Sequence, residues 1–328
     1  MSRLKLKTLV KLAKHAQMLP ILEAGEETLV GGQAVMEGVM MRAPHSYCVA
    51  VRRPDGTVAT QEMAIPRMSE KYPIFKLPVF RGVGTLAQAM QLGMKALQFS
   101  ANESLPPDEK TDAKQEIPGW MMAANLAFSF AFFVFLYKFV PLWITTKLST
   151  VYPEMQGRIL FNFTDGVIRI AIFLSFLYLI SRYKDIHRVF EYHGAEHKVV
   201  FNYESGKPVN VQNAQSFVTF HPRCGTSFLL VVMVLSMIVY TFLPFDTFVA
   251  KFASRIVLIP VIAGLSYEMI RFAAKKRGGM MAMLTAPGLW LQRITTQPPA
   301  DDQTEIAIIA LEGAMKLEQT QGGPLVIA

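Results

Sequence analysis

The chain has 328 residues and a formal net charge of +8; hydrophobic residues make up 52% of it and charged residues only 18%. Together with a mean hydropathy of +0.29, this composition excludes a disordered or fibrous chain and is unusual for a soluble enzyme. The two cysteines, Cys48 and Cys224, are too few for a disulfide framework, so the sequence does not require an oxidising compartment.

Residues 1–27 form a basic segment in which lysines and an arginine alternate with leucines and valine. This pattern fits either an amphipathic helix on an anionic lipid surface or a frayed basic tail. The segment lacks the long apolar core of a secretory signal, so we expect no cleavage. Much of the positive charge lies here and beside apolar stretches, which predicts a lipid bilayer as partner and no nucleic acid.

A small cytoplasmic part with β structure is predicted for residues 28–78. Residues 46–53 and 57–63 flank a Pro-Asp-Gly turn at 54–56, which is typical of a β-hairpin. The preceding block, residues 31–42, contains glycines that indicate close backbone approach to a neighbouring element or a ligand. It matches neither of the common phosphate-loop patterns.

Residues 79–101 carry apolar side chains at spacings of three and four, which predicts a helix. These side chains are Val83, Leu86, Met90, Met94 and Leu97. The segment is also rich in glycine and alanine, and we interpret it as an interfacial or half-inserted helix. A fifth full membrane span would instead place the two chain ends on opposite sides. Residues 102–118, with two adjacent prolines and mixed charges, predict a linker.

Four later stretches are apolar enough to cross a bilayer, which requires about 20 residues. They lie near residues 120–146, 159–181, 225–245 and 252–274. The sequence therefore predicts an α-helical polytopic membrane protein with about four transmembrane helices, two within residues 119–182 and two within residues 225–275.

Lysine and arginine cluster after the second and the fourth apolar stretch, whereas the opposite links hold few of them. Such clusters mark the cytoplasmic side, so we expect both termini and a His/Cys loop, residues 183–224, to face the cytoplasm. By the same orientation, residues 276–328 are predicted to be cytoplasmic. They are also predicted to be helical, because two prolines at 298–299 precede Asp301 and Asp302, which are good helix caps.

Four of the six histidines fall between positions 187 and 221. His193 and His197 are four residues apart, so on a helix they share a face and could bind one metal ion. With Glu196 they form the His-x-x-Glu-His order of the inverted zinc-peptidase motif, in which the carboxylate is the general base. His221 and Cys224 offer two further zinc ligands. Alternatively, the histidines cap helices or lie at the level of the lipid headgroups.

Ionisable residues inside the predicted spans form a second group. Asp165 and Arg169, four residues apart, predict a local ion pair. Glu268 lies three residues before Arg271, and it either pairs with that arginine or acts as a metal ligand or acid–base group beneath the histidine segment. For Cys224, a thiol nucleophile and a small-residue packing contact are further alternatives.

In five blocks the chain resembles the YqhQ-like family of bacterial inner-membrane proteins. These blocks are residues 31–42, 191–198, 221–227, 266–268 and 287–296. The resemblance covers nearly the whole chain and implies a place in the bacterial inner (cytoplasmic) membrane. It also implies a metal-dependent enzyme, without a settled reaction. Similarity to true zinc peptidases ends at the His-x-x-Glu-His motif.

Two functions follow as hypotheses. The first is a metal-dependent hydrolase, embedded in the membrane, that acts at the cytoplasmic face on a lipid or a membrane-proximal peptide. Its divalent metal, zinc by ligand type, would be held by His193, His197 and one or two of His221, Cys224 and Glu268, with Glu196 as general base. The second is a non-catalytic scaffold or regulator with a structural metal site. A membrane protein partner or a second copy of the chain is compatible with either.

Overall fold

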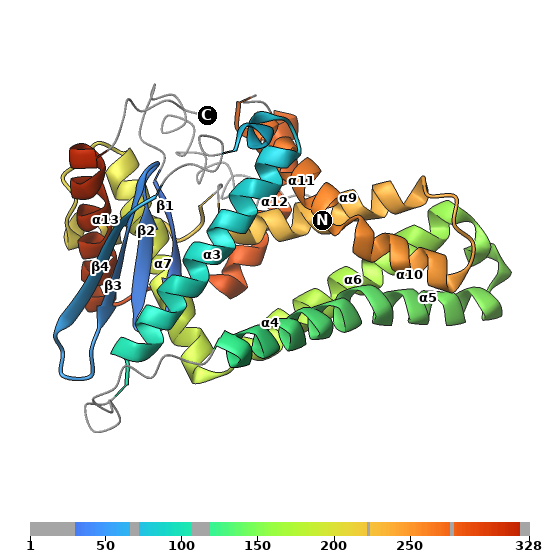
Figure 1. Ribbon diagram of the computed structural model, residues 1–328, viewed down its shortest axis with the longest axis horizontal. Helices are drawn as coiled ribbons and strands as arrows, with labels where there is room; N and C mark the ends of the chain where they lie inside the picture. The colour runs from blue at the N-terminus through green and yellow to red at the C-terminus, as the bar shows by residue number, and fades with distance from the viewer. Residues whose placement is uncertain (1–29, 66–71, 106–118, 222–223, 276–278, 322–328) are drawn as a thin grey trace, which may run out of the picture.

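The computed structural model of this protein describes residues 30–65, 72–105, 119–221, 224–275 and 279–321. The basic segment 1–27, most of the linker 102–118, and Pro222 and Arg223 lie outside the described residues. A small sheet with helices against it lies at one end of the molecule, and long apolar helices extend to the other end (Figure 1).

The sheet has four antiparallel strands in sequence order. They are β1 (Gly31–Val35), β2 (Gly38–Arg42), β3 (Ser46–Arg52) and β4 (Val58–Ala64). The predicted hairpin is confirmed as β3–β4: Gly56 has a φ of +85°, and the Asp55 carboxylate accepts a hydrogen bond of 2.9 Å from the Thr57 amide. The block 31–42 is itself a hairpin, β1–β2, which turns at Glu37.

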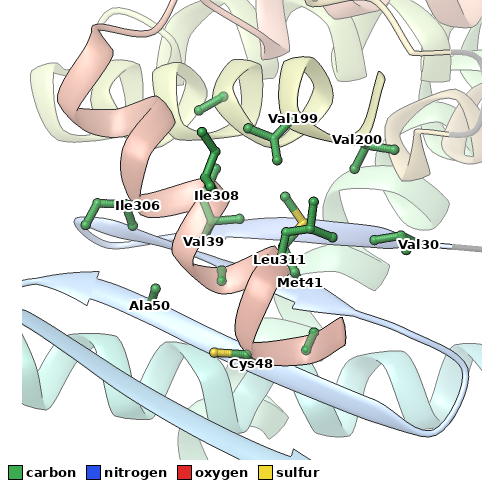
Figure 2. Close-up of a cluster of buried hydrophobic side chains, with 14 of the residues drawn as sticks. Val30, Val39, Met41, Cys48, Ala50, Val199, Val200, Ile306, Ile308 and Leu311 are labelled. Atoms are coloured by element: carbon green, nitrogen blue, oxygen red, sulfur yellow. The ribbon is translucent and has the colours of Figure 1, made fainter. Parts of the chain in front are cut away.

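The central strands β2 and β3 are buried on both faces of the sheet. Successive side chains of a strand point to opposite sides, and helices cover each side. One face packs against α7 (Lys184–Glu204) and α13 (Asp301–Gln321), as Figure 2 shows. The short helix α8 (Val211–Gln215) joins the same core through Ala214. This core contains Val39, Met41, Cys48, Ala50, Val199, Ile306 and Leu311. The C-terminal helix predicted after Asp301 and Asp302 is thus present and covers the sheet.

The other face packs against α3 (Phe80–Glu103), which follows a short 3₁₀ helix, η3 (Pro73–Lys76). The predicted helix exists, but its sheet-facing side includes Leu92, Gly93 and Ala96 rather than the predicted apolar stripe. Met90, in that stripe, is 70% exposed, and Met94 and Leu97 are exposed beside it. Exposure of these side chains is compatible with an interfacial α3, and the interfacial position stays a prediction.

The apolar helices begin with a nearly continuous run and end in a broken pair. They are α4 (Gly119–Val134), the π-helix η5 (Phe135–Phe139), α5 (Val140–Val151), η6 (Pro153–Gln156), α6 (Arg158–Ile180), α9 (Gly225–Thr241), α10 (Phe248–Val257) and α11 (Ile259–Lys275). Helix α12 (Gly279–Thr295) follows and connects them to α13.

Among the described residues, two helices are long and apolar enough to cross a membrane, 123–151 and 158–180. They correspond to the first two predicted spans. The fourth predicted span is the pair α10–α11, bent by 52° at its break, and it counts as a third span only if the pair is taken together. Helix α9 is apolar but shorter. The fold is therefore mostly helical with two or three candidate spans, and four spans remain a prediction.

Candidate metal centre

The structure brings together three residues that the sequence proposed as metal ligands. His193 and His197 lie one turn apart on α7, and Cys224 is the residue that caps the N-terminus of α9. One ligand atom from each lies within 4.8 Å of the other two. The Nε2 atom of His193 is 3.3 Å from the Cys224 sulfur, and the two imidazole centroids are 4.5 Å apart.

Backbone carbonyl groups orient both imidazoles. Nδ1 of His193 lies 2.8 Å from the carbonyl oxygen of Thr295, and Nδ1 of His197 contacts that of Thr219. A carbonyl can only accept a hydrogen bond, so each Nδ1 must carry the proton. The lone pair of each imidazole is then on Nε2. Metal-binding histidines are commonly held in this way.

The imidazole of His197 is also kept neutral. It is almost fully buried, and this burial lowers its pKa below the usual value despite the opposing effect of Cys224. A neutral imidazole is the form that binds metals, so burial favours the ligand state at pH 7.

Gly194 explains how α7 comes so close to the end of α12. A Cβ atom at this position would overlap the carbonyl oxygen of Gln297, whose amide donates a 2.9 Å hydrogen bond to the Phe190 carbonyl. A side chain here would push α7 away from Thr295, which holds His193. The glycine therefore costs helix propensity but permits the site.

Glu196 lies beside the three ligands. Its Oε2 is 3.4 Å from Nε2 of His197, and its side chain is only 7% exposed. It packs over β1, where a Cβ atom at Gly32 would approach the Glu196 Cγ to 2.9 Å. The close approach predicted for the glycine-rich block is thus made to a neighbouring helix.

The turn of the same hairpin is held by Arg188, which binds the Glu37 carboxylate with two guanidinium nitrogens.

His221 lies next to this group without belonging to it. Its ring centroid is 5.5 Å from that of His197, and its Nε2 is 3.6 Å from the Glu204 carboxylate. Gln292 fixes the His221 backbone through hydrogen bonds of 2.7 and 2.8 Å. Burial lowers the pKa of His221 to about 4, so this imidazole is neutral at pH 7.

The structure does not bring Glu268 to this group, contrary to the ligand role considered from sequence. Its carboxylate binds the guanidinium of Arg81 through both oxygens and accepts a 3.3 Å hydrogen bond from the Val79 amide. Both partners belong to the start of α3, and their bidentate contact satisfies the carboxylate where it lies. The main partner of Glu268 is therefore Arg81 of α3, and the predicted neighbour Arg271 adds only a weaker electrostatic attraction.

Sequence reasoning missed the residues that orient the ligands. Thr219 and Thr295 act through backbone carbonyls, which any residue type offers, so no residue pattern marks them. Gln292 lies in the block 287–296, whose only signal was its resemblance to the YqhQ-like family. The α12 end of that block forms one wall of the site.

Fold and site together define a mostly helical protein. Its described part has two apolar helices long enough to cross a membrane, or three candidate spans if the bent pair α10–α11 counts as one. It has a small antiparallel sheet, and a His–His–Cys group between α7 and the start of α9. The family model described as "Protein of unknown function (DUF1385)" matches residues 77–317. The chain therefore belongs to the DUF1385 family.

A curated relative supports the same assignment. The chain is 34% identical over 297 residues to "Uncharacterized protein YqhQ" of Bacillus subtilis (strain 168), covering 88% of this chain and 92% of the relative. The predicted resemblance to the YqhQ-like family is thus confirmed. No solved structure matches the chain.

Proposed function

We propose that this chain is a metal-dependent hydrolase of the bacterial inner membrane, with a zinc ion bound by His193, His197 and Cys224. The observation that carries the proposal is the convergence of three donor atoms within 4.8 Å, two of them on imidazoles oriented by backbone carbonyls. Nitrogen and sulfur donors are those that zinc prefers, and three protein ligands leave a coordination position for water or substrate.

The residues around the group suit hydrolysis. Zinc in such a site supplies Lewis acidity toward a carbonyl or phosphoryl oxygen. Glu196, buried beside His197, is the general base that takes the proton from the attacking water and returns it to the leaving group. Gly32 leaves room for this carboxylate beneath the sheet edge.

The position of the group suggests a substrate at the membrane surface. Cys224 directly precedes apolar helix α9, and α7 begins shortly after α6, a candidate span, ends. The basic residues Arg182, Lys184 and Arg188 follow α6, which favours the cytoplasmic side for this end. A lipid headgroup or a juxtamembrane peptide is therefore the proposed substrate, in a multi-pass protein with four spans and cytoplasmic termini.

A second candidate is a scaffold with a structural metal. The His221 ring lies only 5.5 Å from that of His197, so a small rearrangement would supply a fourth protein ligand. A site closed by four protein ligands is structural rather than catalytic. The choice between the two functions therefore depends on the number of protein ligands and on Glu196.

Metal content tests the site itself. Purified full-length protein, loaded with zinc and freed of excess metal, should retain about one zinc per chain. The double variant His193→Ala with His197→Ala should retain almost none. His187→Ala is the matched control, because His187 lies on the same helix, half exposed and paired with Glu191 at 3.2 Å. Equal zinc in wild type and double variant would refute the site.

Glu196→Gln separates catalysis from scaffolding. It keeps the shape of the side chain but removes the general base, so zinc should still bind. A strain that lacks the gene should not be restored by this variant, whereas Glu312→Gln, exposed on α13, should restore it. Restoration by Glu196→Gln would favour the scaffold instead.

A further inference from the structure

The apolar helices bury more positive than negative charge. The carboxylate of Asp165 binds Arg169, as predicted, and also Arg255 from α10, 90 residues further along the chain. Lys138 lies in the same cluster. Lys138 is 6% exposed, Arg169 and Arg255 are each 2% exposed, and Asp165 is 1% exposed. Three basic side chains and one carboxylate thus lie together, and only the two arginines bind the carboxylate.

Tyr240 gathers these cations but does not neutralise them. Its hydroxyl is 3.1 Å from the Lys138 ammonium, and the three cationic groups lie 5.1 to 5.6 Å from its ring centroid. The Nε of Arg169 is buried and has no hydrogen-bond partner among the described residues. Unbalanced buried charge is costly in apolar surroundings, so a further anion beside the cluster would stabilise it.

The helices are irregular around the cluster. Lys138 lies in the π-helix η5, which interrupts the run from α4 to α5. Arg255 lies three residues before the break between α10 and α11, where the helix axis bends by 52°. π-bulges and broken apolar helices are frequent at binding sites, since both redirect side chains and backbone groups.

A cavity opens beside the cluster. Arg255 and Tyr240 line it together with Asn162, Ser254, Arg158 and Lys251. The Lys251 ammonium lies 4.1 Å from the Phe161 ring centroid and has no hydrogen bond or ion pair with any residue that the structure describes. The one carboxylate of the lining, Asp246, is 82% exposed and is 3.8 Å from Arg158. The lining is therefore cationic, and its further polar groups are the hydroxyls of Tyr240 and Ser254 and the amides of Asn162 and Gln156.

We propose that this cavity binds a phosphate group, carried either by inorganic phosphate or by an anionic phospholipid headgroup. Arginine matches the geometry of phosphate oxygens, and a lysine without an ion partner adds a point charge. The site is distinct from the metal centre, because α9 runs from Cys224 at one end to Tyr240 near the other, about 24 Å at 1.5 Å per residue. Figure 1 shows this far end of α9 beside α10 and the α5–α6 connection.

Thermal unfolding of the full-length protein in a phosphate-free, uncharged detergent tests the proposal. One arm adds inorganic phosphate, a second adds phosphatidylglycerol, and a third adds chloride at equal ionic strength. Saturating phosphate or phosphatidylglycerol should raise Tm by about 3 °C or more above the chloride arm. A response to phosphate identifies the free ion as a ligand, and a response to phosphatidylglycerol alone identifies the headgroup.

Two lysine variants make the test specific. Lys251→Met removes a cation of the cavity and should weaken the response to phosphate or phosphatidylglycerol at least tenfold in concentration. Lys147→Met, exposed on α5 and outside the cavity lining, should respond like wild type. No Tm rise above chloride in either arm, or a wild-type response of Lys251→Met, would overturn the proposal.

Discussion

The sulfur of Cys224 lies 3.3 Å from Nε2 of His193, although 31 residues separate the two in sequence. The contact exists because α7 approaches the end of α12 at Gly194, while α12 approaches α9 at Gly288, where a Cβ atom would overlap Ser227. Three segments of the chain thus meet at one point. The His–His–Cys group therefore forms only in the folded protein, so its zinc binding and the reactivity of its cysteine depend on the correct packing of these three segments.

The two cysteines should differ in reactivity toward iodoacetamide. Cys48 is fully buried beneath α13, and burial, with the nearby Glu62, raises the pKa of its thiol to about 12. Only thiolates react, so Cys48 should stay unlabelled in the folded protein. Cys224 is also largely buried, but it is 9% exposed against 0% for Cys48, so it should be labelled slowly after metal removal and protected by zinc.

Mass spectrometry of the labelled protein, with and without a chelator, measures this difference. A Cys224→Ser variant is the control and should take up no label in either condition. Labelling of Cys224 that zinc leaves unchanged would argue against its role as a ligand, and would favour the Cys–His pair of a thiol nucleophile.

Gly194→Ala should destabilise the protein although alanine is the better helix former by about 1 kcal/mol. The added Cβ would overlap the Gln297 carbonyl oxygen, and we expect a net loss of about 2 kcal/mol or more in the free energy of unfolding. Zinc retention should fall as well, since Thr295 moves away from His193. Gly31→Ala, with nothing within 4 Å of its Cβ, should change stability by less than about 0.5 kcal/mol. Equal unfolding midpoints for the two variants would contradict this account of Gly194.

Local patterns were sufficient for much of the fold. The Pro-Asp-Gly turn at 54–56 identified the β3–β4 hairpin, because its turn type depends on residues adjacent in sequence. The spacing of His193 and His197 placed both on one helical face for the same reason. Helix α3 was also predicted from its apolar stripe, but that stripe did not identify the contact with the sheet, which Leu92, Gly93 and Ala96 make. Small residues that allow close approach give a weaker signal than large apolar ones.

Long-range pairing was not predictable. Arg255 joins Asp165 from 90 residues away, and Glu268 binds Arg81 from 187 residues away, so the local ion pairs proposed from spacing were incomplete. The partner of a charged side chain depends on which helices become neighbours. Residue spacing alone contains no information on that choice.

Asp165→Asn should be strongly destabilising. The variant leaves Arg169 and Arg255 buried without their carboxylate, and removing one partner of a buried pair typically costs about 3–5 kcal/mol. Asp246→Asn is the control, because its 3.8 Å pair with Arg158 is exposed to solvent and is worth less than about 1 kcal/mol. Thermal unfolding in detergent compares the two. A similar Tm for both variants would show that Asp165 does not neutralise the cluster.

Glu318 should make the stability depend on acid pH. Its buried carboxylate accepts hydrogen bonds of 2.8 Å from the His45 amide, the His45 ring and the Ser46 hydroxyl, which fix α13 to the start of β3. Burial acts to raise the pKa of Glu318, but these hydrogen bonds outweigh it and hold the pKa below the usual 4.5. The stabilisation is therefore complete above the unfolded-state pKa and is lost as pH falls through the lower folded-state value.

Glu318→Gln measures this contribution. At pH 7 the variant should be less stable by about 1–3 kcal/mol, and the difference should shrink as pH falls below about 4. Glu312→Gln, exposed on the same helix, should follow wild type throughout. A difference that stays constant from pH 7 to pH 3 would contradict the ionised, hydrogen-bonded state assigned to Glu318.

X-ray absorption at the zinc edge of the loaded full-length protein tests the central claim most directly. The account predicts one sulfur at about 2.3 Å and nitrogen or oxygen ligands at about 2.0–2.1 Å, with imidazole scattering from two histidines. The sulfur contribution should disappear in Cys224→Ser, and the imidazole signal should fall in His193→Ala. A spectrum of zinc surrounded by oxygen alone, unchanged in both variants, would contradict a shared centre of His193, His197 and Cys224.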